Sequence, residues 1–293
     1  MTIGGQNIKG SPFSFVASRN YSNLNRSNRF INVNGCPRGV AFSSNHHWVA
    51  TDTTNHCVYI FNEQDQMVGK IGNRGTGQFN GPRGVSFDDD KILYITDGDN
   101  SRVQKFDLTG HYILQFGRLG SNDKELNGPV GITAHHNKVY IADRRNHRIS
   151  VYQTDGTYCF SFGSYGNGSG QFQYPWDVAA TPDNTVLVAD SEGHCIQLFQ
   201  LDGTFIHKFG TFGSDKGQMN FPSSIAVDPN GFILVTEFNN HRVSIFNKNC
   251  DYIHSFGSYG TGSNQFENPC GIAISPNGSV YISDRGNKRI AIY

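Results

Sequence analysis

Hydrophobic and polar residues alternate along this chain in short runs that turn residues interrupt. Residues 81–117 contain four such runs, at residues 85–87, 92–96, 102–106 and 112–116, with Asp-, Gly- or Thr-containing turns between them. Short runs of β-branched and aromatic residues between turns are typical of β-strands. The stretch therefore predicts an antiparallel meander of four strands. One such sheet cannot bury both faces alone, so several sheets have to pack together.

Copies of this unit recur at a constant spacing. The turn proline, which starts a Pro-x-Gly sequence in four of the six units, returns every 45 to 47 residues, at Pro37, Pro82, Pro129, Pro175, Pro222 and Pro269. The acidic residue that ends the second run keeps the same period, at Asp52, Asp97, Asp143, Asp190, Glu237 and Asp284. Strand-only units of this length are typical of propeller blades and not of helical solenoids. We therefore predict an all-β fold, a six-bladed β-propeller of four-stranded antiparallel blades over residues 36–293.

The last unit lacks a strand. It runs from Pro269 to Tyr293 and contains only three apolar runs. Because a missing strand would leave an exposed sheet edge, we expect the N-terminal segment, residues 1–35, to close the last blade. Counting back from the first turn proline, as in later units, favours Tyr21–Asn25, whereas strand propensity favours Phe13–Ala17. The sequence leaves these two alternatives open.

Composition limits the partners. The formal net charge is zero, so binding to RNA or to an anionic membrane would need a local basic face. No apolar run is long enough to span a bilayer, and we expect no membrane partner. The six cysteines form no CxxC pair, and no secretory signal follows Met1. We therefore expect reduced thiols in a cytoplasmic protein.

The innermost strands carry a negative signal for catalysis. The strand that follows each Pro-x-Gly turn alternates Val, Ile, Phe or Ala with small residues, and no ring of Asp, Glu or His is present. An enzyme with a metal in the axial channel would need convergent carboxylates or imidazoles there. We therefore expect no catalytic residue, no metal and no cofactor.

The turn between the second and third strands places an acid five residues before an arginine. The pairs are Asp97–Arg102, Asp143–Arg148, Glu237–Arg242 and Asp284–Arg289. A ring of binding arginines is one interpretation. The interpretation we favour is a staple in which each carboxylate holds its own arginine, because the pair repeats in four of six units. The histidines of these turns also repeat around the ring. They are therefore spread apart, which does not favour a metal site shared by several of them.

Units such as ADRRNHRISVYQTDGTYCFSFGSYGNGSGQFQYPWDV resemble NHL repeats, named for the Asn-His-Leu-type turn seen here as Asn146-His147 and Asn240-His241. The resemblance covers about residues 36–293 and implies a six-bladed propeller. Residues 10–13 also resemble the last strand of a filamin-type repeat, so residues 1–35 are interpreted as the end of that repeat, a linker and the closing strand. Filamin followed by NHL is the arrangement of the heterochronic, developmental branch of the TRIM-NHL family. A RING, a B-box and a coiled coil would then lie outside this chain, and ubiquitin-ligase activity would belong to the RING.

The same resemblance implies RNA binding on one propeller face. The expected partners are messenger RNAs, recognised through untranslated-region elements for translational repression or decay, and protein co-repressors. We expect the propeller itself to be monomeric. A protein-interaction module that recruits substrates for a ligase is the alternative, with Trp176, Phe238 and Tyr165 as anchors on the same face.

The candidate RNA-binding residues lie at the end of the propeller where the Pro-x-Gly turns emerge. Guanidinium groups bind phosphate and aromatic rings stack on bases, so basic and aromatic residues are the relevant types. The candidates next to the turn proline are Arg38, Arg83 and Trp176; those after the acid are Arg144, Arg145, Phe238 and Arg285; those in the long links are Arg74, Arg118, Lys124 and Tyr165. The post-proline position departs from this basic pattern at Val130, Ser223 and Cys270, and the opposite end carries Asp88, Asp89, Asp90 and Asp228.

Overall fold

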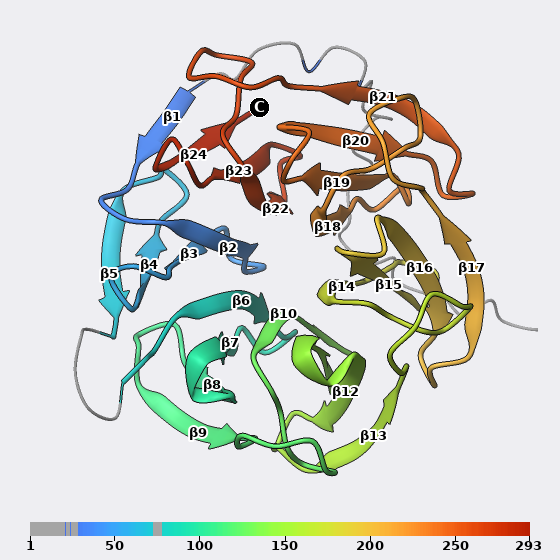
Figure 1. Cartoon of the computed structure of the whole chain (residues 1–293). Coiled ribbons are helices and arrows are strands. Elements are labelled where there is room, and N and C mark those ends of the chain that lie inside the picture. Colours follow the sequence, from blue (N-terminus) through green and yellow to red (C-terminus); the bar gives the residue numbers. More distant parts are fainter. Residues whose placement is uncertain (1–20, 22–23, 25–28, 73–77) are drawn as a thin grey trace, which may run out of the picture.

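Six four-stranded antiparallel sheets form a ring around a central channel in the computed structural model, which describes Tyr21, Leu24, residues 29–72 and residues 78–293 (Figure 1). The predicted all-β, six-bladed propeller is confirmed. Within the described residues, no helix has the length and apolar character needed to cross a membrane.

Each blade is a meander whose strands pair in chain order. Blades one to three consist of β2 (Pro37–Phe42), β3 (Trp48–Asp52), β4 (Cys57–Phe61) and β5 (Met67–Ile71); β6 (Pro82–Phe87), β7 (Leu93–Asp97), β8 (Arg102–Phe106) and β9 (Tyr112–Phe116); and β10 (Pro129–His135), β11 (Lys138–Asp143), β12 (Arg148–Gln153) and β13 (Tyr158–Phe162). Blades four and five consist of β14 (Pro175–Ala180), β15 (Thr185–Asp190), β16 (Cys195–Gln200) and β17 (Phe205–Phe209); and β18 (Pro222–Val227), β19 (Ile233–Glu237), β20 (Arg242–Phe246) and β21 (Tyr252–Phe256). Blade six contains β22 (Pro269–Ile274), β23 (Val280–Asp284) and β24 (Arg289–Ile292), and β1 (Arg29–Asn32) completes it.

The first strand of every blade faces the channel (Figure 1). In all six blades the register with the second strand shifts directly after the turn proline, as between Pro82 and Val85 in blade two. A bulge of this kind redirects the side chains beside it. The residue after each proline consequently lines one end of the channel, which we call the mouth.

The core is a ring of apolar clusters between neighbouring blades. Between blades one and two, for example, Val49 and Ile60 pack with Val85 and Ile95, and all four are buried. Burial of aliphatic side chains of this size stabilises the fold by about 1.5–3 kcal/mol each. The clusters explain why one blade alone is not a folding unit.

The closing strand differs from both sequence-based candidates. β1 pairs antiparallel with β24, from Arg29 opposite Ile292 to Asn32 opposite Arg289. Counting back failed because the connection from β1 to β2 is much shorter than the later links between blades. Strand propensity failed because the free edge of β24, and not the longest apolar run of the N-terminal segment, determines which residues pair with it. The alternative Phe13–Ala17 lies outside the described residues.

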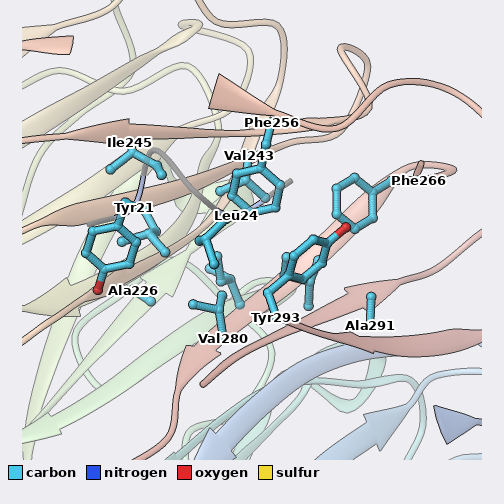
Figure 2. Close-up of a cluster of buried hydrophobic side chains, with 13 residues drawn as sticks. Tyr21, Leu24, Ala226, Val243, Ile245, Phe256, Phe266, Val280, Ala291 and Tyr293 are labelled. Carbon is cyan, nitrogen blue, oxygen red and sulfur yellow. The ribbon is translucent and has the colours of Figure 1, made fainter. Parts of the chain in front are cut away.

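Tyr21 and Leu24 instead belong to a buried cluster between blades five and six (Figure 2). The Tyr21 ring lies 5.4 Å from that of Phe232, and its hydroxyl donates to Asp228 Oδ2 at 2.9 Å. Leu24 lies near Val243 and Phe256 in the same cluster (Figure 2). The N-terminal segment therefore contributes to the core as well as to the edge.

Asp65 ties the two ends of the chain to blade one. Its Oδ1 accepts hydrogen bonds from Trp48 Nε1 at 2.8 Å and from the Tyr281 hydroxyl at 2.9 Å, and its carboxylate forms an ion pair with Arg29. Blade one, blade six and the closing strand meet at this single carboxylate.

Candidate functional site

The six post-proline residues come together at the mouth of a channel of about 330 Å³. They are Arg38, Arg83, Val130, Trp176, Ser223 and Cys270. Blades one and four lie on opposite sides of the ring, so Arg38 and Trp176 approach each other across the mouth (Figure 1).

Hydroxyl groups on the second strands fix the backbone of this ring. Thr51 Oγ1 accepts from the Gly39 N–H at 2.8 Å and donates to the Arg83 carbonyl of the next blade at 2.6 Å. Thr96 repeats the arrangement with Gly84 and Val130, at 2.8 and 2.6 Å. Each hydroxyl therefore links two adjacent post-proline turns and sets the position from which the side chains at the mouth extend.

The glycine of the Pro-x-Gly turn is required by close packing of adjacent turns. A Cβ on Gly39 would lie 2.4 Å from the Arg83 carbonyl oxygen, and one on Gly84 would lie 2.3 Å from the Val130 carbonyl oxygen. Backbone atoms this close leave no room for a side chain. The narrow mouth is thus a direct result of the turn sequence.

Four arginines converge on the mouth from two types of turn. The Cζ atoms of Arg38 and Arg144 lie 5.6 and 5.2 Å from the centre of the Trp176 ring, and that of Arg285 lies 5.7 Å from the Phe238 ring. Cation–π contacts at these distances hold a guanidinium without neutralising it. Arg83 forms an ion pair with Asp99, 3.0 Å from its Nη2.

These arginines are incompletely satisfied. The Nε atoms of Arg38, Arg83, Arg144 and Arg285 are buried and have no hydrogen-bond partner among residues 29–72 and 78–293. Burial, together with neighbouring Arg83 and Arg145, lowers the pKa of Arg144 to about 10. Burial lowers the pKa of Arg38 as well, and Arg83 and Arg285 add to the effect. Like charges are therefore held close together in a partly buried cluster, an arrangement suited to an anion.

The remaining candidates are more peripheral. Arg145 is exposed beside Arg144 in the short 3₁₀ helix of residues 144–146. Arg118 and Lys124 are exposed in the link before blade three, and Arg118 pairs with Glu125 at 3.2 Å. Tyr165 is exposed in the link before blade four. Arg74 lies outside the described residues.

Four large apolar side chains recur at one position of the inter-blade links. Leu119, Tyr165, Phe212 and Tyr259 each expose 66–70% of their surface. The last three contact the histidine of the neighbouring turn, with ring centres 4.8–4.9 Å apart. We call these four residues the apolar arc. Tyr165 is among the candidates predicted from the sequence, and the repeat of the Phe-Gly-x-(Leu/Tyr/Phe)-Gly pattern is the signal that identifies the whole set.

The repeated acid–arginine pairs form as the staple interpretation predicts. The arginine Nε of all four pairs lies 2.7–2.9 Å from its carboxylate, which is fully buried. Arg148 also donates to the carbonyls of Ser121, Asn122 and Glu125 in the preceding link. With their donors used in this way, these arginines hold the turns and links and are separate from those at the mouth.

The turn histidines bind backbone groups of the next blade. Nδ1 of His56, His194 and His241 accepts an N–H from Gly81, Phe221 and Asn268, respectively, at 3.0–3.3 Å. Burial lowers the pKa of His194 and of His241. Each imidazole is committed to its own blade junction.

At the opposite end of the propeller, two of the four aspartates serve local structure. Asp88 Oδ1 accepts from the Ile92 N–H at 2.9 Å, and Asp228 Oδ1 accepts from the Phe232 N–H at 2.8 Å. Asp89 and Asp90 are exposed. The acids of this end thus divide between turn formation and surface charge.

Asp177 is a channel residue that the sequence reasoning did not single out. It replaces the turn glycine in blade four, and its Oδ2 accepts from Ser224 Oγ at 2.6 Å and from the Ile225 N–H at 2.9 Å. Burial raises its pKa to about 6. An acid in place of glycine in Pro-x-Gly is the signal that marks it. Within the described part of the chain, no three His, Cys, Asp or Glu residues are placed to hold a metal ion.

The turn and link pattern described above agrees with a family model for the NHL repeat, which matches residues 79–106, 126–152, 172–199, 219–246 and 266–293. The chain carries NHL repeats. Each match covers the end of a link and the first three strands of one blade, in blades two to six. No curated protein sequence matches the NHL propeller significantly.

Solved structures of similar shape support the fold of the NHL propeller. A streptogramin B lyase is 14% identical with a TM-score of 0.66, covering 90% of this chain and 96% of that one. The Swd1 β-propeller domain from Myceliophteria thermophila is 13% identical with a TM-score of 0.62, covering 90% and 98%. A chain of a nidogen–laminin complex is 14% identical with a TM-score of 0.61, covering 81% and 84%. At these identities the likeness concerns the fold alone.

Proposed function

We propose that the mouth face of this propeller binds RNA. The observation that carries the proposal is the cluster of Arg38, Arg83, Arg144 and Arg285, whose Nε atoms have no partner among the described residues, beside Trp176. Planar guanidiniums gathered in one place suit phosphate oxygens, and RNA recognition combines such contacts with stacking on aromatic rings. A zero net charge does not oppose this, because a local cluster of arginines lies at the mouth.

The residues divide into three roles. Arg38, Arg144 and Arg285 contact phosphate, and Arg145 extends the basic surface outward. Trp176 orients the first two guanidiniums, since both already lie against its ring. Exposed rings such as Tyr165 offer stacking surfaces for bases.

The resemblance to TRIM-NHL proteins sets the biological context of the proposal. We infer that the chain is the propeller of such a protein, with a filamin-type repeat before it, and that it works in the cytoplasm as a monomeric module. Its RNA partners would be messenger RNAs, which it represses or directs to decay with protein co-repressors. No cofactor is needed for this role.

The proposal is tested by selecting RNAs from a random pool and measuring the affinity of the best binder across a salt series. Arg38→Ala and Arg144→Ala should each weaken binding and reduce the slope of log affinity against log salt by about one unit. Lys248→Ala, which removes an exposed charge from the opposite end, is the matched control and should leave both unchanged. Failure of the pool to yield any bound RNA would refute the proposal.

Protein binding is a second candidate because of the apolar arc. Side chains exposed to this extent and repeated in consecutive blades resemble the anchors of a protein interface more than isolated surface residues. A photo-crosslinking residue at Phe212 should capture a protein partner in cells, whereas one at Lys248 should not. Equal labelling at both positions would argue against an interface at the arc.

We also propose that the propeller is not an enzyme. The channel is lined mainly by Val, Ile, Ala, Ser and Thr, and its acid, Asp177, is committed to Ser224 and Ile225. A stoichiometric metal that survives exhaustive dialysis, and that is lost on Asp177→Asn, would overturn this.

A further inference from the structure

The arginines at the mouth converge on one point and do not follow a track. Arg38 and Arg144 approach Trp176 from blades one and three, and the charge of Arg38 is also opposed by Arg83 and Arg285. An extended chain of singly charged phosphodiesters is matched best by cations spaced along a groove. A compact group of cations is matched best by several negative charges in one place.

Acidic groups near the mouth offset little of this charge. Asp99 pairs with Arg83, but its side chain is 48% exposed, so water screens that pair. The Asp177 carboxylate accepts from Ser224 and Ile225 and contacts none of the arginines. Below the mouth the channel is apolar, with residues such as Val40 and Ala179. The described residues therefore supply little counter-charge, which leaves this role open to a ligand.

Other arginines of this propeller use their donors more fully than the arginines at the mouth. Arg148 uses Nε, Nη1 and Nη2 in hydrogen bonds to Asp143 and to three carbonyls. Arg289 does the same with Asp284 and the link before blade six. The mouth arginines are equally enclosed yet keep an unused Nε donor.

We propose that the mouth is a binding site for a phosphomonoester, the terminal phosphate of an RNA strand. This inference rests on the proposed RNA binding and adds an end-specific contact to it. A phosphomonoester carries about −1.5 to −2 charges at neutral pH and three acceptor oxygens, whereas an internal phosphodiester carries one charge. Three oxygens match the forked donors of Arg38 and Arg144, which lie against the same ring. The channel volume of about 330 Å³ is at the lower end of the range for small-ligand sites, so a terminal nucleotide is of suitable size.

The experiment uses one internally labelled RNA oligonucleotide in three forms, with a 5′-phosphate, with a 3′-phosphate, and with hydroxyls at both ends. We expect a terminal phosphate to tighten binding at least ten-fold at low salt. Tighter binding of only the 5′- or only the 3′-phosphorylated RNA identifies which end the site recognises. If both phosphorylated forms bind equally well and inorganic pyrophosphate competes with them, the site recognises the phosphate group itself. Equal affinity of all three forms would overturn the inference while leaving RNA binding intact. Absence of binding by every form would overturn both.

Variants connect the preference to the mouth. Arg38→Ala and Arg144→Ala should remove the ten-fold preference, and Lys248→Ala, at an exposed lysine of the opposite end, should retain it. Where an alanine variant melts much lower than the parent, Arg38→Lys replaces it, because lysine keeps the charge but loses the fork. A preference that persists in all of these variants would place the contact elsewhere and refute the site.

Discussion

The staple arginines offer the most quantitative test of how this propeller is held together, and Arg148→Ala is the variant we develop. Arg148 donates from Nε to Asp143 Oδ2 at 2.9 Å and from its Nη atoms to Ser121, Asn122 and Glu125 carbonyls at 2.9–3.1 Å. It therefore joins the end of β11 to the link that precedes blade three. Alanine at this position removes all four hydrogen bonds.

The expected loss of folding free energy in Arg148→Ala follows from the burial of Asp143. Its side chain is fully buried, and removal of one partner of a buried ion pair typically costs about 3–5 kcal/mol. Asp143 keeps hydrogen bonds from the Asn127 N–H at 2.7 Å and Asn146 Nδ2 at 2.8 Å, so we expect the lower end, about 3 kcal/mol. With an unfolding entropy of about 2.1 cal/mol/K per residue, this corresponds to a decrease in Tm of about 5 °C.

The loss of stability in Arg148→Ala should depend on pH. Burial already raises the pKa of Asp143, and loss of Arg148 raises it further. A carboxyl whose folded pKa exceeds its unfolded pKa destabilises the fold above the folded pKa, because the folded state then has to hold the charge. As the pH falls through that pKa, Asp143 is protonated and the need for a counter-charge disappears. The difference in Tm between parent and variant should therefore be largest near pH 7 and shrink toward pH 5.

The assay is thermal unfolding followed by circular dichroism at several pH values. Arg118→Ala is the matched control, because Arg118 also pairs with an acid, Glu125, but is 81% exposed. Exposed pairs contribute about 0–1 kcal/mol, so this variant should melt within about 2 °C of the parent. Equal shifts for the two variants, or a deficit for Arg148→Ala that is constant with pH, would refute the reasoning.

Three further predictions concern closure and the blade junctions. A chain starting at Val33 should melt lower and aggregate more than one starting at Tyr21, since it exposes the edge of β24; equal melting and solubility would contradict this. Because the pKa of His194 is lowered in the folded state, the unfolded chain takes up the proton first as the pH falls, which lowers Tm below about pH 6.5. His194→Gln should therefore make Tm depend less on pH in this range. A Tm profile identical to that of the parent would argue against this role of His194. Thr96→Val should lower stability by about 1–3 kcal/mol in denaturant unfolding by leaving buried groups unpaired, and no loss would exclude a structural role for the hydroxyl.

The blade pattern was predictable because it is local. The turn proline, the acid that ends the second strand and the staple arginine recur at a fixed spacing, and each performs its role within one blade or its adjoining link. The first strands were assigned correctly for the same reason. Even the structural role of Arg148 and Arg242 followed from the repeat of the acid five residues before them.

The closing strand and the contacts at the candidate site could not be predicted, because they depend on residues that only closure of the ring brings together. The closing strand Arg29–Asn32 has only two apolar residues, Phe30 and Ile31, and the link that follows it is unusually short, so the repeat period does not identify it. The contact of Arg38 with Trp176 spans opposite blades. The sequence could place both at the same end of the propeller but could not show that Arg144 lies against the same ring. Asp177 was missed because its role depends on Ser224 of the neighbouring blade.

The two sets of arginines also separate stability from the binding proposed for the mouth. An arginine that follows an acid in the same turn forms a closed set of hydrogen bonds, and its loss should affect folding. An arginine next to the turn proline or in the variable part of the turn has no acid at that spacing, and its Nε has no hydrogen-bond partner among the described residues. The ring repeats the first set in four blades, which fixes the turns from which the second set extends. Variation of the second set can therefore change the ligand without a large cost in stability, because the groups that hold the turns are different residues.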